Sequence, residues 1–169
     1  MTSFDTDSTR PPPNIPEFAS FEHQKENIVP LRQGRSAALL AHQFSAPSSD
    51  LSAERASVHA HFADELAHLD DLDDPLDVFS RYIRWTLEAY PQGPNHESNL
   101  VPLLEQVTRK FKNERRYKND PRYLRCWLLY ANYVEEPKDI FVFLMRNDIG
   151  TDLAALYEDY ALLLEKMGR

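Results

Sequence analysis

The chain has 169 residues, of which 42% are hydrophobic and 11% aromatic, enough for one folded domain with its own core. A net charge of −8 argues against general nucleic-acid binding, because neutralising phosphates requires a surplus of Lys and Arg. The single cysteine, Cys126, excludes an internal disulfide and a cysteine zinc site, and favours a reducing compartment. No stretch approaches the roughly 18 apolar residues of a membrane helix, and no signal peptide follows Met1.

The chain begins with two polar segments. Residues 1–20 are rich in Ser, Thr, Asp and Pro, which predicts a disordered leader, because this composition buries too little apolar surface to offset the entropy lost on ordering. Residues 21–46 are predicted to carry a charged motif and a short helix. The motif, EHQKENIVPLRQGR at residues 22–35, has too few apolar residues to bury itself.

Two helices are predicted next. Ser36 is a suitable N-cap for the first, which would carry three large apolar side chains on one face, those of Leu39, Leu40 and Phe44. The stretch at residues 46–50 contains Pro and Ser and interrupts the helical pattern. A second helix is then predicted for about residues 51–69, from apolar residues at helical spacing.

The rest of the chain is more regular. Two Asp-Pro pairs, at 74–75 and 120–121, each predict a helix start, since Asp can accept an unpaired backbone N–H and Pro has none to lose. Pro91 and Pro137 are expected to close these helices. Further helices are predicted over residues 99–112, 138–147 and 151–167, the first capped by Ser98 or Asn99.

Helix pairs of similar length predict an all-α fold of antiparallel hairpins over residues 50–169. The best register is with the tetratricopeptide repeat. Its aromatic and small positions are filled by Trp127, Tyr130 and Ala131, and 30 residues later by Tyr157, Tyr160 and Ala161. The repeat is irregular, because the two Asp-Pro pairs lie 46 residues apart.

No pattern predicts catalysis. Four scattered glycines cannot form a phosphate-binding loop. A metal site is conceivable at His61, Asp64, Glu65 and His68, but a solvated helix face is favoured, since no further ligand set is evident. The acidic run at residues 70–74 lacks the glycine and alternation of a calcium loop and leads into a helix start, where carboxylates are favourable. We therefore predict no enzyme activity, no metal and no cofactor for this chain.

A basic cluster interrupts the acidic chain. Residues 109–125 carry eight cations against two acids, Glu114 and Asp120, and so a net charge of +6. The cations are Arg109, Lys110, Lys112, Arg115, Arg116, Lys118, Arg122 and Arg125. They could dock an acidic partner, although cations at a solvated helix end are the favoured interpretation. Trp85 and Trp127 are predicted core residues.

The tripeptide Lys25-Glu26-Asn27 lies outside the predicted core, where a partner can reach it. Alone it is a weak signal. Together with five longer segments, it resembles the Mad/Bub spindle-checkpoint family, in particular the BubR-type proteins. The segments are KENIVPLRQGR, DPLDVFSRYIRWTLEAYPQG, ESNLVPLLEQ, NDPRYLRCWLLYANYVEEP and NDIGTDLAALYEDYALLLEKMGR. The resemblance covers about residue 20 to the end.

The resemblance implies a tetratricopeptide-like domain behind a KEN box. It implies that Lys25, Glu26 and Asn27 bind the β-propeller co-activator of the anaphase-promoting complex as a pseudosubstrate. The matching flank consists of Pro30, Leu31, Gly34 and Arg35. The helix over residues 36–44 would help hold the co-activator against a HORMA-domain Mad protein in the mitotic checkpoint complex. The kinetochore scaffold and a Bub-type protein are further implied partners, and the nucleus, kinetochore and cytoplasm the implied locations.

The sequence also departs from the family. Its helical region ends at Arg169, where the family's normally continues, so the last repeat is expected to be truncated. The second KEN box and the kinase domain of some relatives are absent from these residues. A kinase domain beyond residue 169 stays open. The alternative function is a helical scaffold module, or the regulatory N-terminus of a checkpoint kinase, in which KEN serves only as a degron.

Overall fold

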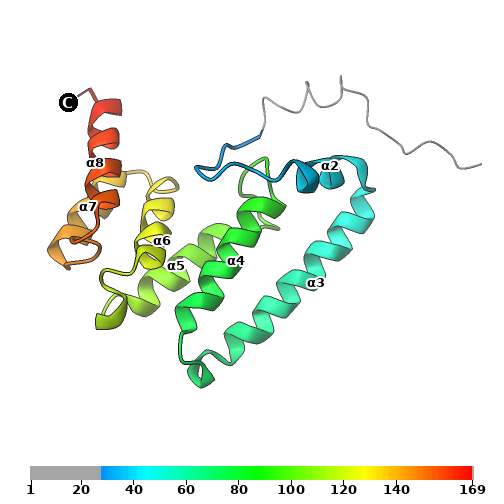
Figure 1. The fold of residues 1–169 in the computed structure, drawn as a ribbon, viewed down its shortest axis with the longest axis horizontal. Coiled ribbons are helices and arrows are strands. Elements are labelled where there is room, and N and C mark those ends of the chain that lie inside the picture. The colour runs from blue at the N-terminus through cyan, green and yellow to red at the C-terminus, as the bar shows by residue number, and fades with distance from the viewer. Residues whose placement is uncertain (1–27, 169) are drawn as a thin grey trace, which may run out of the picture.

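The computed structural model describes residues 28–168, and these contain seven α-helices, two short 3-10 turns and no strand. The helices are α2 (Ala37–Ser45), α3 (Ser48–Ala67), α4 (Pro75–Ala89), α5 (Leu100–Phe111), α6 (Pro121–Ala131), α7 (Pro137–Arg146) and α8 (Ala154–Lys166) (Figure 1). The predicted all-α class is confirmed. The leader at residues 1–20 and the tripeptide Lys25-Glu26-Asn27 lie outside the described residues.

The helices form a row of antiparallel pairs (Figure 1). Each helix from α3 to α8 packs on its neighbour in sequence. In addition, α8 packs on α6, and α6 packs on α4. Apolar residues three and four apart give α4 and α5 one buried stripe each. The largest fully buried side chains are Leu76, Phe79, Leu100, Leu103, Leu104, Tyr123, Leu124, Leu144, Ile149 and Leu156. Within residues 28–168, no helix is long and apolar enough to cross a bilayer.

Both predicted Asp-Pro starts are helix starts, but only one Asp caps its helix. Asp120 accepts the backbone N–H of Arg122 at 2.8 Å. Asp74 caps nothing, because its carboxylate is turned to side chains of the α5–α6 turn. Pro137 opens α7 instead of closing α6, which already ends at Ala131.

The other predicted starts shift by a few residues. The second helix begins at Ser48, inside the predicted break, and α8 begins at Ala154. Of the two candidate caps of α5, Ser98 accepts the backbone N–H of Leu100 with its hydroxyl, at 3.4 Å. Asn99 has φ +54° and makes no side-chain cap bond.

Ser36 caps α2 as predicted, with its hydroxyl 3.4 Å from the amide of Leu39. The apolar side chains of α2 are nevertheless not core, and Leu39 is 47% exposed. Trp127 and Ala131, placed in the repeat pattern, are buried in α6, and Trp85 packs on the same core, so the two tryptophans are core residues as predicted. In α8, by contrast, Tyr157 of the same pattern is 50% exposed.

Candidate functional site

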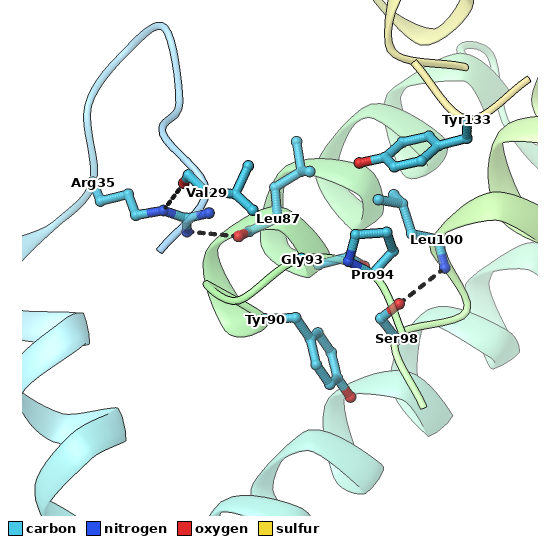
Figure 2. A pocket seen from close by; sticks show the side chains of 10 residues that line it. Val29, Arg35, Leu87, Tyr90, Gly93, Pro94, Ser98, Leu100 and Tyr133 are labelled. Carbon is cyan, nitrogen blue, oxygen red and sulfur yellow. Dashed lines mark hydrogen bonds between the residues drawn. The ribbon is translucent and has the colours of Figure 1, made fainter. Parts of the chain in front are cut away.

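The segment from Ile28 to Ser36, which directly follows the KEN tripeptide, is fixed to the C-terminal end of α4. The amide of Val29 donates to the carbonyl of Pro91 at 2.8 Å. The carbonyl of Val29 accepts from Arg35 Nε at 2.7 Å, and Arg35 Nη1 donates to the carbonyl of Leu87 at 2.7 Å (Figure 2). The backbone of Val29 is therefore held on both sides, two residues after Asn27.

The last turn of α4 explains why it binds this segment. The final carbonyls of a helix lack intrahelical partners and carry partial negative charge. Three side chains supply the donors: Arg35 from the segment, Gln43 from α2 at 2.9 Å and Arg55 from α3 at 2.6 Å. They bind the carbonyls of Leu87, Glu88 and Ala89 respectively. The N-terminal elements are thus joined to one helix end.

The matched flank residues differ in what they do. The amide of Gly34 closes a turn on the carbonyl of Leu31 at 2.9 Å, and Gly34 has φ +75°, a conformation that favours glycine. A Cβ at Gly34 would meet no atom within 4 Å, so its requirement is conformational and not steric. Arg35 makes the anchor. Leu31 is half-buried, and Pro30 is exposed.

The seam between this segment and the α4–α5 loop is closely packed. A Cβ at Gly93 would lie 3.4 Å from the Val29 side chain. One cavity at the seam, lined among others by Tyr90 and Tyr133, measures about 10 Å³, which is about one water molecule (Figure 2). Burial lowers the pKa of the Arg35 guanidinium, and the nearby Glu88 carboxylate opposes that shift. The contacts between Val29, Arg35 and the end of α4 thus anchor the segment.

A histidine reinforces the same end of α4. His59 on α3 places Nδ1 2.6 Å from the Tyr82 hydroxyl and Nε2 2.9 Å from the Tyr90 hydroxyl. The Arg55 guanidinium lies 4.5 Å from the centre of the Tyr90 ring. Desolvation, and secondly the charge of Arg55, lower the pKa of His59, so the neutral ring is favoured in the fold.

The candidate metal ligands on α3 are paired separately. His61 contacts Glu65 at 3.1 Å, and His68 lies 4.0 Å from an Asp64 carboxylate oxygen. Glu65 binds Arg81 of α4, and this hydrogen bond lowers the pKa of its carboxyl. In the part of the chain that the structure describes, no three His, Cys, Asp or Glu side chains are grouped as metal ligands.

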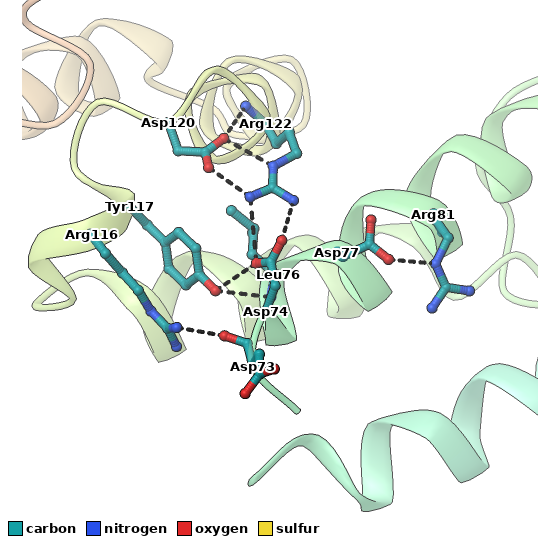
Figure 3. Close-up of polar contacts among 9 residues, drawn as sticks. All are labelled: Asp73, Asp74, Leu76, Asp77, Arg81, Arg116, Tyr117, Asp120 and Arg122. Atoms are coloured by element: carbon teal, nitrogen blue, oxygen red, sulfur yellow. Dashed lines mark hydrogen bonds and ion pairs between the residues drawn. The ribbon is translucent and has the colours of Figure 1, made fainter. Parts of the chain in front are cut away.

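The acidic run at residues 70–74 meets the basic cluster (Figure 3). Arg122 donates to Asp74 and to Asp120, each at 2.7 Å. The Tyr117 hydroxyl also donates to Asp74 at 2.7 Å, and Arg116 donates to the carbonyl of Asp73 at 2.7 Å. The hydrogen bonds from Arg122 are the largest cause of the lowered pKa values of Asp74 and Asp120. These contacts join the start of α4 to the start of α6.

The basic cluster is consequently not one free surface. Arg116, Lys118 and Arg122 all bind groups of the fold, Lys118 through the carbonyl of Asn147 at 2.7 Å. Among residues 28–168, the side chains of Lys112, Arg115 and Arg125 make no hydrogen bond or ion pair, and they are exposed. The favoured interpretation, cations at a solvated helix end, therefore describes only part of the cluster, because three of its cations bind groups of the fold.

Comparison with known proteins identifies the family. Residues 57–169 match Mad3/BUB1 homology region 1. The chain belongs to this family. It is 41% identical over 153 residues to the mitotic spindle checkpoint component mad3 of Schizosaccharomyces pombe, covering 87% of this chain and 48% of mad3. It is 39% identical over 148 residues to human mitotic checkpoint serine/threonine-protein kinase BUB1 beta, covering 86% of this chain and 14% of that protein.

Two solved structures support the fold of this Mad3/BUB1 region. A chain of the crystal structure of the mitotic checkpoint complex aligns with a TM-score of 0.79 and 40% identity, covering 88% of this chain and 76% of that one. The conserved N-terminal domain of the mitotic checkpoint component BUB1 aligns with a TM-score of 0.64 and 26% identity, covering 72% and 64%. The chain spans about half or less of the curated relatives above. The resemblance to the Mad/Bub family is confirmed.

Proposed function

We propose that this chain is a component of the mitotic checkpoint complex that inhibits the anaphase-promoting complex as a pseudosubstrate. Lys25, Glu26 and Asn27 bind the β-propeller co-activator through one ammonium, one carboxylate and one amide, which polar groups on a rigid surface can read with little apolar burial. The occupied co-activator then cannot bind a mitotic substrate, so the ubiquitin ligase does not ubiquitylate it.

The observation that carries this proposal is the double fixation of Val29. Its amide binds Pro91 and its carbonyl binds Arg35, so the backbone two residues after the motif is held at a defined place on the helical domain. Restraining a flank before binding reduces the entropy lost when a linear motif is captured. A degron would gain from the same restraint, so the ubiquitylation reaction described below is needed to separate an inhibitor from a degron.

The remaining partners follow from the family and from α2. This helix has no buried residue and leaves Leu39 47% exposed, which suits a helix that contacts the co-activator and a HORMA-domain Mad protein together. The helical domain docks the kinetochore scaffold and a Bub-type partner, which places the protein in the nucleus and at kinetochores, as well as in the cytoplasm. The region has the position of the family's N-terminal domain and acts without catalysis of its own.

A reconstituted ubiquitylation reaction separates inhibition from degradation. The chain is added to the ligase, the co-activator and a labelled substrate, as wild type and with Lys25, Glu26 and Asn27 all changed to alanine. The proposal expects the wild type to stop substrate ubiquitylation and the variant to lose this inhibition. If both inhibit equally, and the variant only escapes its own ubiquitylation, KEN is a degron and the scaffold alternative is correct.

A further inference from the structure

The segment after the KEN tripeptide has a second contact, at the opposite end of the described chain. Arg32 stands at the tip of the turn that Gly34 closes on Leu31. Its guanidinium binds the carboxylate of Asp159 on α8, 127 residues away in sequence. The Arg32 side chain is 69% exposed and that of Asp159 only 19%, so the pair lies at the edge of the α8 surface.

The two contacts restrain different motions. The hydrogen bonds of Arg35 and Val29 fix the segment at the end of α4, but a segment held at one place can still swing about it. The bend of the loop between residue 28 and α2 points away from α4, towards the side of α6 to α8 (Figure 1), and Arg32 reaches Asp159 of α8. A second contact at a distance from the first removes that swing.

We infer that Asp159 is a positioning residue for the KEN box: by holding Arg32, α8 sets the direction in which residues 25–27 leave the helical domain. This inference rests on the proposed function for its effect on binding. It gives α8 a part in presenting a motif that precedes α2 in the sequence. Removing either charge leaves the hydrogen bonds of Val29 and Arg35 in place and removes the second restraint on the segment.

A charge exchange tests the pair. The variants are Arg32→Glu, Asp159→Arg and the two combined, with Arg84→Glu as the matched control. Arg84 is exposed on α4, and within residues 28–168 its side chain has no hydrogen bond or ion pair. Each single variant places like charges together, and the combined variant restores opposite charges with the partners reversed. Rescue by the combined variant distinguishes a direct pair from a general loss of folding.

The first readout needs no co-activator. Spin labels are placed at Gln24→Cys and Asn113→Cys, and the distance distribution between them is measured in each background. Cys126 stays unlabelled, because it is buried and its thiol pKa is raised to about 12 by burial. The distribution should broaden in both single variants, narrow again in the combined variant and stay unchanged in Arg84→Glu. Unchanged distributions in the single variants, or no recovery in the combined one, would overturn the inference.

The second readout is the Kd for the purified β-propeller co-activator. Each single variant should weaken binding about two- to fivefold, the range for an exposed ion pair, and the combined variant should recover it. Equal affinities in the wild type and the three charge variants would overturn the role of Asp159 in presentation. If the wild type itself does not bind, the proposed function fails, and the distance measurement still decides whether Asp159 holds the segment.

Discussion

The Arg35 guanidinium binds the carbonyl of Leu87 at 2.7 Å, although 52 residues separate them in sequence. The same group binds the carbonyl of Val29 at 2.7 Å. One side chain therefore joins the end of α4 to the residues that follow the KEN tripeptide. The planar guanidinium suits this task, because its donors point in fixed directions towards two acceptors.

Replacing Arg35 should release the segment without unfolding the helical domain. Arg35→Ala removes both hydrogen bonds, and we expect the amide of Val29 to lose protection in hydrogen exchange, with co-activator binding weakened about fivefold. Arg35→Lys should give an intermediate result, since an ammonium lacks the fork. Arg125→Ala, at an exposed position on α6, is the control. Full protection of Val29 in Arg35→Ala would show that the anchor lies elsewhere.

Two glycines allow the general backbone penalty of an alanine substitution to be distinguished from an effect specific to the segment after the KEN tripeptide. Gly34 has φ +75° and Gly168 has φ +74°, and a Cβ at either would meet nothing within 4 Å. Alanine at each position should therefore carry a similar backbone penalty of about 1 kcal/mol. Only Gly34→Ala should weaken KEN-dependent binding, because only that turn belongs to the segment. Titration of both variants against the co-activator checks this, and an equal effect of both would argue against a role for the turn.

The contacts between the start of α4 and the start of α6 should make the free energy of unfolding depend on pH in the acidic range. Hydrogen bonds from Arg122 lower the pKa values of Asp74 and Asp120 below the unfolded value of about 3.9. A depressed carboxyl pKa stabilises the fold above the unfolded pKa, and this contribution is lost as pH falls through the folded pKa. Arg122→Gln should lower the free energy of unfolding by about 1 kcal/mol at pH 7. In urea unfolding, the difference from wild type should shrink between pH 5 and pH 2, and a constant difference would contradict this.

His59 should act in a different pH window. Its folded pKa lies below the unfolded value of about 6.5, so the unfolded chain binds a proton that the folded chain resists. Stability should therefore fall as pH drops below about 6.5, and His59→Gln should reduce this slope. His68 has the opposite effect on the pH dependence of stability, because a hydrogen bond to the backbone of Asp64 raises the pKa of His68. The comparison of the two chains by urea unfolding from pH 7.5 to 5 isolates His59, and identical slopes would exclude its contribution.

The Asp-Pro pairs predicted where two helices start, but not which groups the two aspartate side chains bind. Asp-Pro marks the start of α4 and of α6, since proline fits the first helical position whatever surrounds it. Whether the aspartate then caps its helix depends on competitors. The Asp120 carboxylate accepts the backbone N–H of Arg122, but that of Asp74 accepts from the side chains of Tyr117 and Arg122, 43 and 48 residues away. No spacing rule contains that information.

The candidate site shows the same division. The resemblance placed Gly34 and Arg35 in the motif flank, but nothing in the sequence paired Arg35 with Leu87 or Arg32 with Asp159. Sequence reasoning missed Arg32 and Asp159 altogether. One signal was available for the α4 anchor: a helix ended by Pro91 must find donors for its last carbonyls, and the preceding polar segment carries arginines and an amide.

The central claim is that Lys25, Glu26 and Asn27 bind the β-propeller co-activator. The most direct measurement is a titration of the purified co-activator with three chains, with and without the HORMA-domain partner. They are the wild type, the variant with Lys25, Glu26 and Asn27 changed to alanine, and a control with the same three residue types changed to alanine at Lys112, Asn113 and Glu114, all exposed. The account predicts that the wild type and the control bind alike and more tightly with the HORMA partner, while the KEN variant loses about tenfold or more in affinity. Equal binding by the wild type and the KEN variant, or no binding by any chain, would contradict it.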